Sequence, residues 1–224
     1  MNGVIVLDKP AGTSSARAVD QVKRLLPRGT KIGHAGTLDP FATGVLLLLV
    51  GKATKMCERL MDSPKQYEAT VKLGATTETD DPESPEQPTP GAQVVALDTI
   101  EREVRRFVGA IQQTPPQYSA IKLGGKRACD RVRDGEAVKI EPRTVQVYGI
   151  QILRYEWPHL ELKIDCGRGT YIRSIARDLG EKLGSGGYLT TLRRTRVGDY
   201  SIGQSVTLDE LRARGVDSHI HAIT

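Results

Sequence analysis

The sequence predicts an α+β fold, and three observations indicate it. Residues 45–50 form an unbroken apolar run between two glycines, which is typical of a fully buried strand. Residues 171–183 instead place apolar side chains at helical spacing along one face. Segments of both kinds alternate through all 224 residues without an internal repeat or a long linker. We therefore expect a single domain, 1–224, whose elements share one core.

The N-terminal part of the chain contains two strands and two helices. Residues 3–8 begin with glycine and continue with four apolar residues, which indicates a strand. Thr13 or Ser14 can then cap a helix that runs to about residue 26, just before a proline. The buried strand 45–50 follows, and a second helix is expected over 53–61.

The middle of the chain begins with a strand over 67–73, where apolar and polar residues alternate. Residues 80–92 are acidic and rich in proline, so they are expected to form an exposed loop. Asp98 and Glu101 have the spacing of a capping box that opens the next helix. A short basic helix near 127–133 is expected to end at an Asp-Gly pair.

The C-terminal part completes the fold with four strands and two helices. Gly184 directly follows the last apolar position of the longest helix and supplies its C-terminal stop. In chain order the six segments are 145–157, 160–166, 171–183, 188–195, 197–201 and 208–214.

Composition limits the classes of function. Charged residues make up 26% and hydrophobic residues 38%, as in an ordinary soluble protein, and no apolar stretch is long enough to span a membrane. The N-terminus lacks the basic start and long apolar region of a signal peptide, so we expect a cytoplasmic protein. The three cysteines are far apart, and no histidine lies at metal-ligand spacing beside them. This argues against a disulfide framework and against a zinc site.

The charge distribution favours a polyanionic partner. The net charge is +5, with basic residues gathered at 122–133 and 193–196 and acidic residues at 78–86. Such separation favours a basic face against a phosphate backbone, and the same pattern also fits solvated surface charges. Aromatic residues are only 4% of the chain, so a broad stacking platform of the single-strand-binding kind is not expected.

One carboxylate has an unusual local setting. Asp39 precedes a proline, which holds it in an extended conformation, and it lies in the glycine-rich segment 33–44. The glycines allow another chain to approach the backbone closely, and the buried strand 45–50 anchors the segment at its C-terminal end. Local chemistry alone also fits an ordinary Asp-Pro turn.

Six segments together resemble the TruB family of pseudouridine synthases, in the family's order and over nearly the whole chain. They are residues 7–14 (LDKPAGTS), 33–44 (GHAGTLDPFATG), 65–67 (KQY), 115–122 (PPQYSAIK), 169–173 (GTYIR) and 192–194 (LRR). The resemblance implies the pseudouridine synthase fold, a mixed and mainly antiparallel sheet flanked by helices. It also implies isomerisation of the uridine at position 55, in the TΨC loop of tRNA, with neither cofactor nor metal.

The resemblance further implies which residues act. Asp39 matches the catalytic aspartate, and Arg173 matches the position whose guanidinium pairs with that carboxylate. A base inside a folded RNA loop must be flipped out before it can react. Tyr67 is expected to stack on the flipped base and Tyr171 to line the same pocket, although each tyrosine alone also fits a half-buried structural residue.

Three more positions carry supporting roles in this resemblance. His34 is expected to contact the displaced RNA loop rather than to act as an acid or base. Leu192 corresponds to an apolar contact in the pocket. Lys9, with the proline after it, is expected to brace the catalytic loop from beneath.

The segment at about 115–135 matches an insertion that folds over the RNA. Its basic residues suit phosphate contacts, which position a nucleic acid without reading its sequence. They are Lys122, Lys126, Arg127 and Arg131.

The C-terminal end departs from the common bacterial pattern. We expect no C-terminal RNA-binding PUA domain after the helix at 208–214, and hence no guide RNA. The expected partner is the TΨC arm of tRNA, bound by a monomer.

Two other functions compete with this interpretation. A tRNA-folding chaperone could use the same surface without catalysis, but the combination of Asp39, Tyr67, Tyr171 and Arg173 disfavours it as the only role. A hydrolase with an aspartate nucleophile would need a second catalytic carboxylate or histidine, and none lies at a recognisable spacing.

Overall fold

The computed structural model describes residues 1–222, except for the side chains of Lys122, Leu123 and Arg127. The chain divides into two compact units, and each is described by itself. Unit 1 consists of Met1–Glu68 and Leu192–Thr224, and unit 2 of Ala69–Thr191. Two strands, β4 (Lys65–Leu73) and β12 (Gly187–Val197), contribute residues to both units. The expectation of a single catalytic domain stays a prediction.

Unit 1 is built around β3 (Thr43–Val50), the apolar run that the sequence marks as a buried strand. β1 (Gly3–Lys9) pairs with it antiparallel along its whole length. On the other edge, β2 (Ile32–Ala35) pairs antiparallel with its second half, and β12 pairs parallel with its first two residues. The short β13 (Tyr200–Ser201) extends β12. Because β3 has strands on both edges and is buried on both faces, it holds the segment before it in place.

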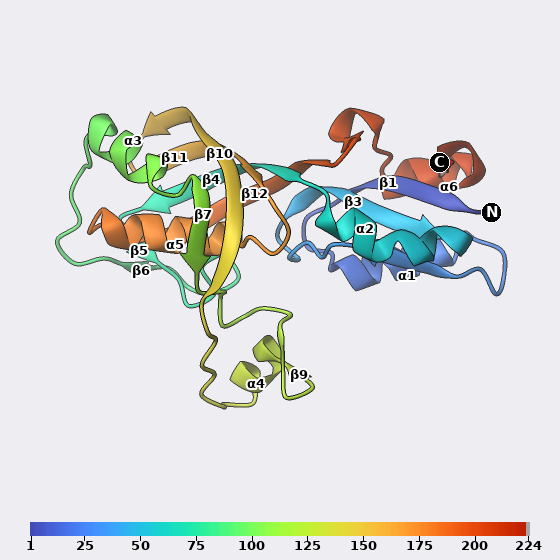
Figure 1. The fold of residues 1–224 in the computed structure, drawn as a ribbon, viewed down its shortest axis with the longest axis horizontal. Helices are drawn as coiled ribbons and strands as arrows, with labels where there is room; N and C mark the ends of the chain where they lie inside the picture. Colours follow the sequence, from blue (N-terminus) through green and yellow to red (C-terminus); the bar gives the residue numbers. More distant parts are fainter. Residues whose placement is uncertain (223–224) are drawn as a thin grey trace. The chain divides into compact units, whose positions relative to one another are not determined.

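Helices cover the sheet of unit 1 (Figure 1). α1 (Ser15–Lys23) and α2 (Cys57–Asp62) contact β2, and α6 (Leu208–Arg214) contacts β1. Ser14, one of the two residues predicted to cap this helix, caps α1 through its side chain. The helix ends at Lys23, three residues earlier than expected. Three short 3-10 turns complete the unit. They are η1 (Gly51–Met56), η2 (Ile202–Gln204) and η3 (Asp217–His219).

Unit 2 has its own set of strands, in the order β12, β4, β11 (His159–Cys166), β10 (Arg143–Glu156) and β7 (Gly109–Gln113). β10 pairs antiparallel with both β11 and β7. α3 (Leu97–Arg105) contacts β10 and α5 (Ile172–Lys182). A small pair, β5 (Ala75–Thr76) with β6 (Gln87–Pro88), closes the loop between β4 and α3.

The predicted insertion is a separate small element of unit 2. It contains β8 (Lys122–Leu123) paired with β9 (Lys126–Arg127), followed by the short helix α4 (Ala128–Arg133). Figure 1 shows α4 and β9 away from the strands of their unit. The predicted end of this helix is confirmed, since the chain turns at Asp134 and Gly135.

The predicted fold class is confirmed: helices flank a mixed sheet in which the β3–β12 pairing is parallel and the other described pairings are antiparallel. Three local predictions were wrong. The helix expected over 53–61 begins as the 3-10 turn η1, where the Thr54 hydroxyl bonds to the Gly51 carbonyl at 2.8 Å. The strand expected to stop at residue 195 continues to Val197. Asp98 lies inside the first turn of α3 and bonds to the amide of Thr99, so it forms no capping box.

Candidate active site

Asp39 lies in the turn between β2 and β3, and the backbone of this turn is held from several sides. We call residues 36–45 the Asp39 loop. The hydroxyl of Ser15, at the start of α1, accepts a bond from the Leu38 amide at 2.9 Å and donates one to the Leu38 carbonyl at 3.0 Å. The side chain of Leu38 is itself buried. The residue directly before Asp39 is therefore fixed in both position and direction.

Lys9 holds the residue directly after Asp39. It lies at the end of β1, is fully buried, and donates from Nζ to the carbonyls of Pro10, Thr13 and Pro40 at 2.8, 2.7 and 3.2 Å. The Pro40 carbonyl also accepts a bond from the Gly12 amide at 2.8 Å. These contacts fit the bracing role that the family resemblance implies for Lys9.

Arg194 is a third support of the Asp39 loop. Its side chain is 1% exposed and donates to the carbonyls of Gly36, Thr37 and Val45 at 3.0, 3.4 and 2.7 Å. The charge pattern predicts Arg194 in a basic cluster on the surface, facing either RNA phosphates or solvent, and for this residue that prediction is wrong. The available signal was strand alternation, because side chains two apart on a strand share a face and Leu192 is buried.

Gly44 shows why the Asp39 loop needs glycine where it joins β3. Its φ angle is +99°, and a Cβ atom there would lie 2.2 Å from the carbonyl oxygen of Arg194. Any other residue would therefore push β12 away from β3. The close approach of backbone predicted from the glycines is made here by β12 of the same chain.

His34 lies on β2, immediately before this loop, and is half-buried. Burial, with a smaller contribution from the nearby charge of Arg194, lowers the pKa of the imidazole below its ordinary value. His34 is thus neutral at pH 7. A neutral imidazole can hydrogen-bond to a base through one donor and one acceptor nitrogen, but it adds no charge attraction for phosphate. Tyr67 on β4 and Leu192 on β12 are also in unit 1, and both are buried.

Tyr171 belongs to unit 2, at the start of α5. The side-chain amide of Gln113 accepts a bond from its backbone N–H at 2.8 Å and donates to its carbonyl at 3.1 Å. The Arg143 guanidinium lies 5.2 Å from the ring centroid, a cation–π distance. Gln113 therefore fixes the backbone of Tyr171, and Arg143 contacts its ring.

Arg173, in the first turn of α5, is buried against Asp81. Its Nη1 lies 3.0 Å from Asp81 Oδ2, with side chains that are 3% and 2% exposed. The same guanidinium donates to the carbonyls of Thr79 at 2.8 Å and Tyr118 at 2.9 Å. Asp81 Oδ1 accepts further bonds from the Thr79 hydroxyl and the Glu83 amide. Asp39 belongs to unit 1 and Arg173 to unit 2, so their expected pairing stays a prediction.

The start of the segment 80–92 is buried, contrary to the exposed loop expected there. Asp80 and Asp81 lie in the interior, and each is paired with an arginine of α5, Asp81 with Arg173 and Asp80 with Arg177, both at 3.0 Å. Asp80 has a φ of +58°, a conformation that only aspartate and asparagine adopt with some frequency among residues other than glycine. Acidic residues that look like a solvated loop can therefore line a buried ionic cluster.

Asp80→Asn is expected to change how stability depends on pH. Burial raises the pKa of Asp80 to about 6, against an ordinary value near 3.8, although Arg177 opposes the shift. The folded protein thus binds this proton more tightly than the unfolded chain, and stability falls as pH rises from about 4 to about 6. The variant lacks this loss. As pH rises through this range, its free energy of unfolding should therefore increase relative to that of wild type by up to about 3 kcal/mol. Urea unfolding at pH 4.5 and 8 measures the difference, and a pH-independent difference would contradict it.

The basic residues of the insertion face carboxylates of the same segment. Lys126 contacts Asp134 and lies 3.1 Å from Glu136, and Arg131 lies 2.6 Å from Glu136. All four side chains are at least 31% exposed, so these pairs contribute little to stability and can exchange for phosphate. The predicted contacts of Lys122 and Arg127 fall on side chains outside the described residues.

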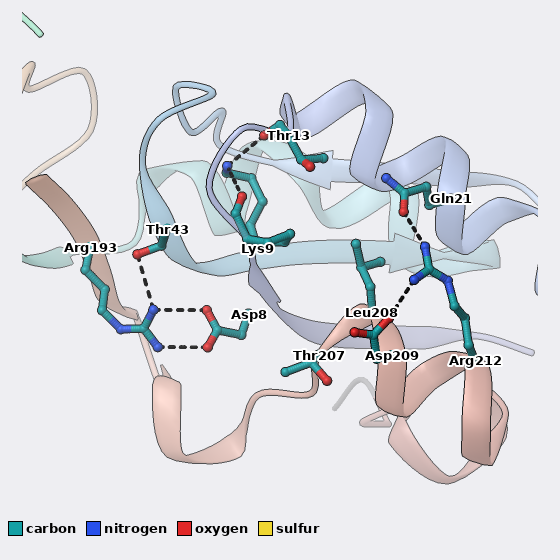
Figure 2. A pocket seen from close by; sticks show the side chains of 11 residues that line it. Asp8, Lys9, Thr13, Gln21, Thr43, Arg193, Thr207, Leu208, Asp209 and Arg212 are labelled. Atoms are coloured by element: carbon teal, nitrogen blue, oxygen red, sulfur yellow. Dashed lines mark hydrogen bonds and ion pairs between the residues drawn. The ribbon is translucent and has the colours of Figure 1, made fainter. Parts of the chain in front are cut away.

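Unit 1 also contains a cavity of about 430 Å³ beside Lys9 (Figure 2). Arg193 and Asp8 are joined at one end of it by two bonds of 3.2 and 2.8 Å, and Arg212 pairs with Asp209 at 2.6 Å. Because each guanidinium in the cavity has a carboxylate partner, we assign it no anionic ligand. Arg193 points to the opposite face of β12 from Arg194.

Two absences concern the described part of the chain. No helix within residues 1–222 is both long and apolar enough to cross a bilayer. The same residues contain no cluster of histidine, cysteine and acidic side chains that could hold a metal ion.

Comparison with known proteins gives a consistent result. The family model described as TruB family pseudouridylate synthase, N-terminal domain, matches residues 23–172, and that of the tRNA pseudouridylate synthase B C-terminal domain matches 173–220. The tRNA pseudouridine synthase B of Aromatoleum aromaticum is 43% identical over 98% of this chain and 71% of its own. That of Thermobifida fusca is 45% identical over 95% and 75%.

Solved structures agree with the sequence comparison. A chain of a Cbf5–Nop10–Gar1 complex superposes with a TM-score of 0.74 at 32% identity, covering 98% of this chain. A chain of an H/ACA RNP bound to a substrate RNA containing 2′-deoxyuridine gives 0.71 at 30% identity. This chain spans 57% and 53% of those two chains, so they are longer proteins that share the fold described above.

Proposed function

Because the chain belongs to the TruB family of pseudouridylate synthases, we propose that it converts uridine 55, in the TΨC loop of tRNA, to pseudouridine. In this reaction the bond between N1 of the base and C1′ of the ribose breaks, and a bond between C5 and C1′ forms. The proton on C5 leaves to solvent, and N1 gains one. Substrate and product have the same composition, so the balance requires no oxidant, reductant or group donor.

The observation that carries the proposal is the fixed backbone on both sides of Asp39. Ser15 holds residue 38 and Lys9 holds residue 40, so the backbone that carries the carboxylate is fixed on both sides. Such positioning of a reacting group accounts for much of the rate enhancement of enzymes. An ionised carboxylate there can attack C1′, attack the base, or remove a ribose proton, and each role needs the same fixed placement.

The remaining site residues have complementary roles in the proposal. The target base leaves its stack, which costs a few kcal/mol, and Tyr67 stacks on it afterwards. Tyr171 and Leu192 line the pocket around the flipped base, and neutral His34 contacts the displaced RNA loop. Arg173 pairs with Asp39 and keeps it ionised.

In this proposal the chain binds the TΨC arm of tRNA directly, as a monomer and without a guide RNA. The reaction then takes place in the cytoplasm, where tRNA is modified. The insertion lies on the phosphate backbone of the arm through Lys126 and Arg131. Recognition of folded RNA then depends on shape and on a few splayed bases.

Release of tritium from tRNA labelled at C5 of uridine tests the proposed reaction, because only loss of the C5 proton frees the label. We expect about one equivalent of tritium per tRNA and none from a transcript with cytidine at position 55. Release from the cytidine transcript would contradict the assigned position. Tight tRNA binding without release would favour the tRNA-folding chaperone instead.

Neutralising the insertion is expected to weaken binding to all RNAs alike. The double variant K126Q/R131Q should reduce the slope of log affinity against log salt by roughly 0.7 to 0.9 for each phosphate that it no longer neutralises. Glu136→Gln is the matched control, because it removes the carboxylate that contacts both cations. It should strengthen binding by up to about fivefold, the scale of an exposed ion pair. Filter binding between 50 and 200 mM salt measures both, and an unchanged slope in the double variant would exclude backbone contact by this segment.

A further inference from the structure

We propose that Arg194 is a positioning residue for Asp39, holding the two ends of the Asp39 loop at a fixed separation. This inference rests on the proposed catalytic role of Asp39. It gives a specific task to a residue that neither the charge pattern nor the cavity of unit 1 explains.

The geometry joins both arms of the loop through one planar group. Two of its three bonds go to the carbonyls of Gly36 and Thr37, before Asp39, and the third goes to Val45, after it. A guanidinium presents its donors in a rigid fork, so three carbonyls that bind it cannot shift independently. Ser15 and Lys9 each hold one residue beside Asp39, whereas the three bonds of Arg194 reach both arms of the loop.

The burial and charge of Arg194 indicate that the group does more than fill space. In the described part of the chain, the bonding partners of its guanidinium are all neutral carbonyl oxygens. A buried cation without a carboxylate is costly, and an apolar side chain of similar volume would pack the same site at lower cost. Arg193 in the same strand, and Arg173 and Arg177 in unit 2, all have carboxylate partners. What Arg194 adds is the set of fixed carbonyl contacts around the Asp39 loop.

The backbone of Arg194 is placed as tightly as its side chain. It pairs in register with Gly44, the residue whose missing Cβ lets the two strands approach. The guanidinium therefore starts from a defined point on β12 and cannot follow the loop if the loop moves. Arg194 acts on Asp39 through the backbone of the loop.

Arg194→Met and Arg194→Lys test the inference, with Arg212→Met as the control for loss of an arginine at an exposed site of the same unit. A loop displaced by about 1 Å costs on the order of a hundredfold in turnover. We expect that loss in kcat for Arg194→Met, with KM changed by less than about threefold. The lysine variant keeps the charge and some of the carbonyl bonds, so it should recover about tenfold. The control should match wild type.

Hydrogen exchange supplies a readout that needs no turnover. The amides of Gly12 and Ala42 bond to carbonyls of the Asp39 loop and should exchange faster in the Arg194 variants, while amides of β1 stay protected. If the variants show this pattern but wild type makes no pseudouridine, the proposed function fails, while the role of Arg194 in fixing the Asp39 loop is supported. Unchanged kcat in both variants, or exchange that rises equally throughout unit 1, would overturn the role of Arg194. If the methionine variant does not fold, the lysine variant decides by the same two measurements.

Discussion

Asp39→Asn is expected to lower pseudouridine formation at least about a thousandfold, or about 4 kcal/mol of transition-state stabilisation, while tRNA is still bound. The amide has no negative charge and offers neither a nucleophilic nor a basic oxygen. The contacts of Ser15 and Lys9 with the loop are to main-chain atoms of the neighbouring residues, so they persist in the variant. Single-turnover tritium release and filter binding on the same preparation separate the two effects.

Asp20→Asn is the control for this variant, because Asp20 is an exposed carboxylate on α1 of the same unit. It should retain wild-type turnover. If Asp39→Asn keeps more than about a tenth of the wild-type rate, Asp39 has no direct part in the reaction. If it loses binding and turnover together, the carboxylate acts in placing the RNA.

The parts of the fold that follow from neighbouring residues were predictable from sequence. The apolar run of β3 is long enough to be a strand on its own, and Ser14 lies one residue before the first turn of α1. The apolar spacing of α5 likewise predicts its helix within a residue at each end. Each of these signals lies within or directly beside the element that it predicts.

The contacts that hold the candidate site were not predictable in the same way. Arg194 is separated from Gly36 by 158 positions, and Arg173 from Thr79 by 94. A charged residue gives no local sign of whether a distant carbonyl or carboxylate will meet it in the interior. The family resemblance implies roles for Asp39, Tyr67 and Arg173, whereas it contains Arg194 only as the last residue of the motif 192–194 and gives it no role. Long-range polar contacts have to be read from the structure.

Asp81→Asn is expected to destabilise the protein by about 3–5 kcal/mol, because it leaves the buried Arg173 without its counter-charge. Asparagine has nearly the same shape, but neither orientation of its amide satisfies the site. Its NH₂ group would face either the Arg173 guanidinium or the Glu83 amide, and both of these donate to Asp81 in the wild type. Arg173 would lose its orientation, so we also expect kcat to fall on the order of a hundredfold at temperatures where the variant is folded.

Asp80→Asn is the matched control for Asp81→Asn. It makes the same change at the adjacent residue, whose carboxylate also pairs with an arginine of α5. Asp80 is 13% exposed against 2% for Asp81, and its environment already disfavours the charged form. At pH 8 the Asp80 variant should therefore be at least as stable as wild type and fully active, while the Asp81 variant loses both stability and turnover. Urea unfolding and single-turnover rates on the two variants compare these outcomes. Equal behaviour of the pair would mean that Asp81 does not orient Arg173, and that the arginine is held by the carbonyls of Thr79 and Tyr118 alone.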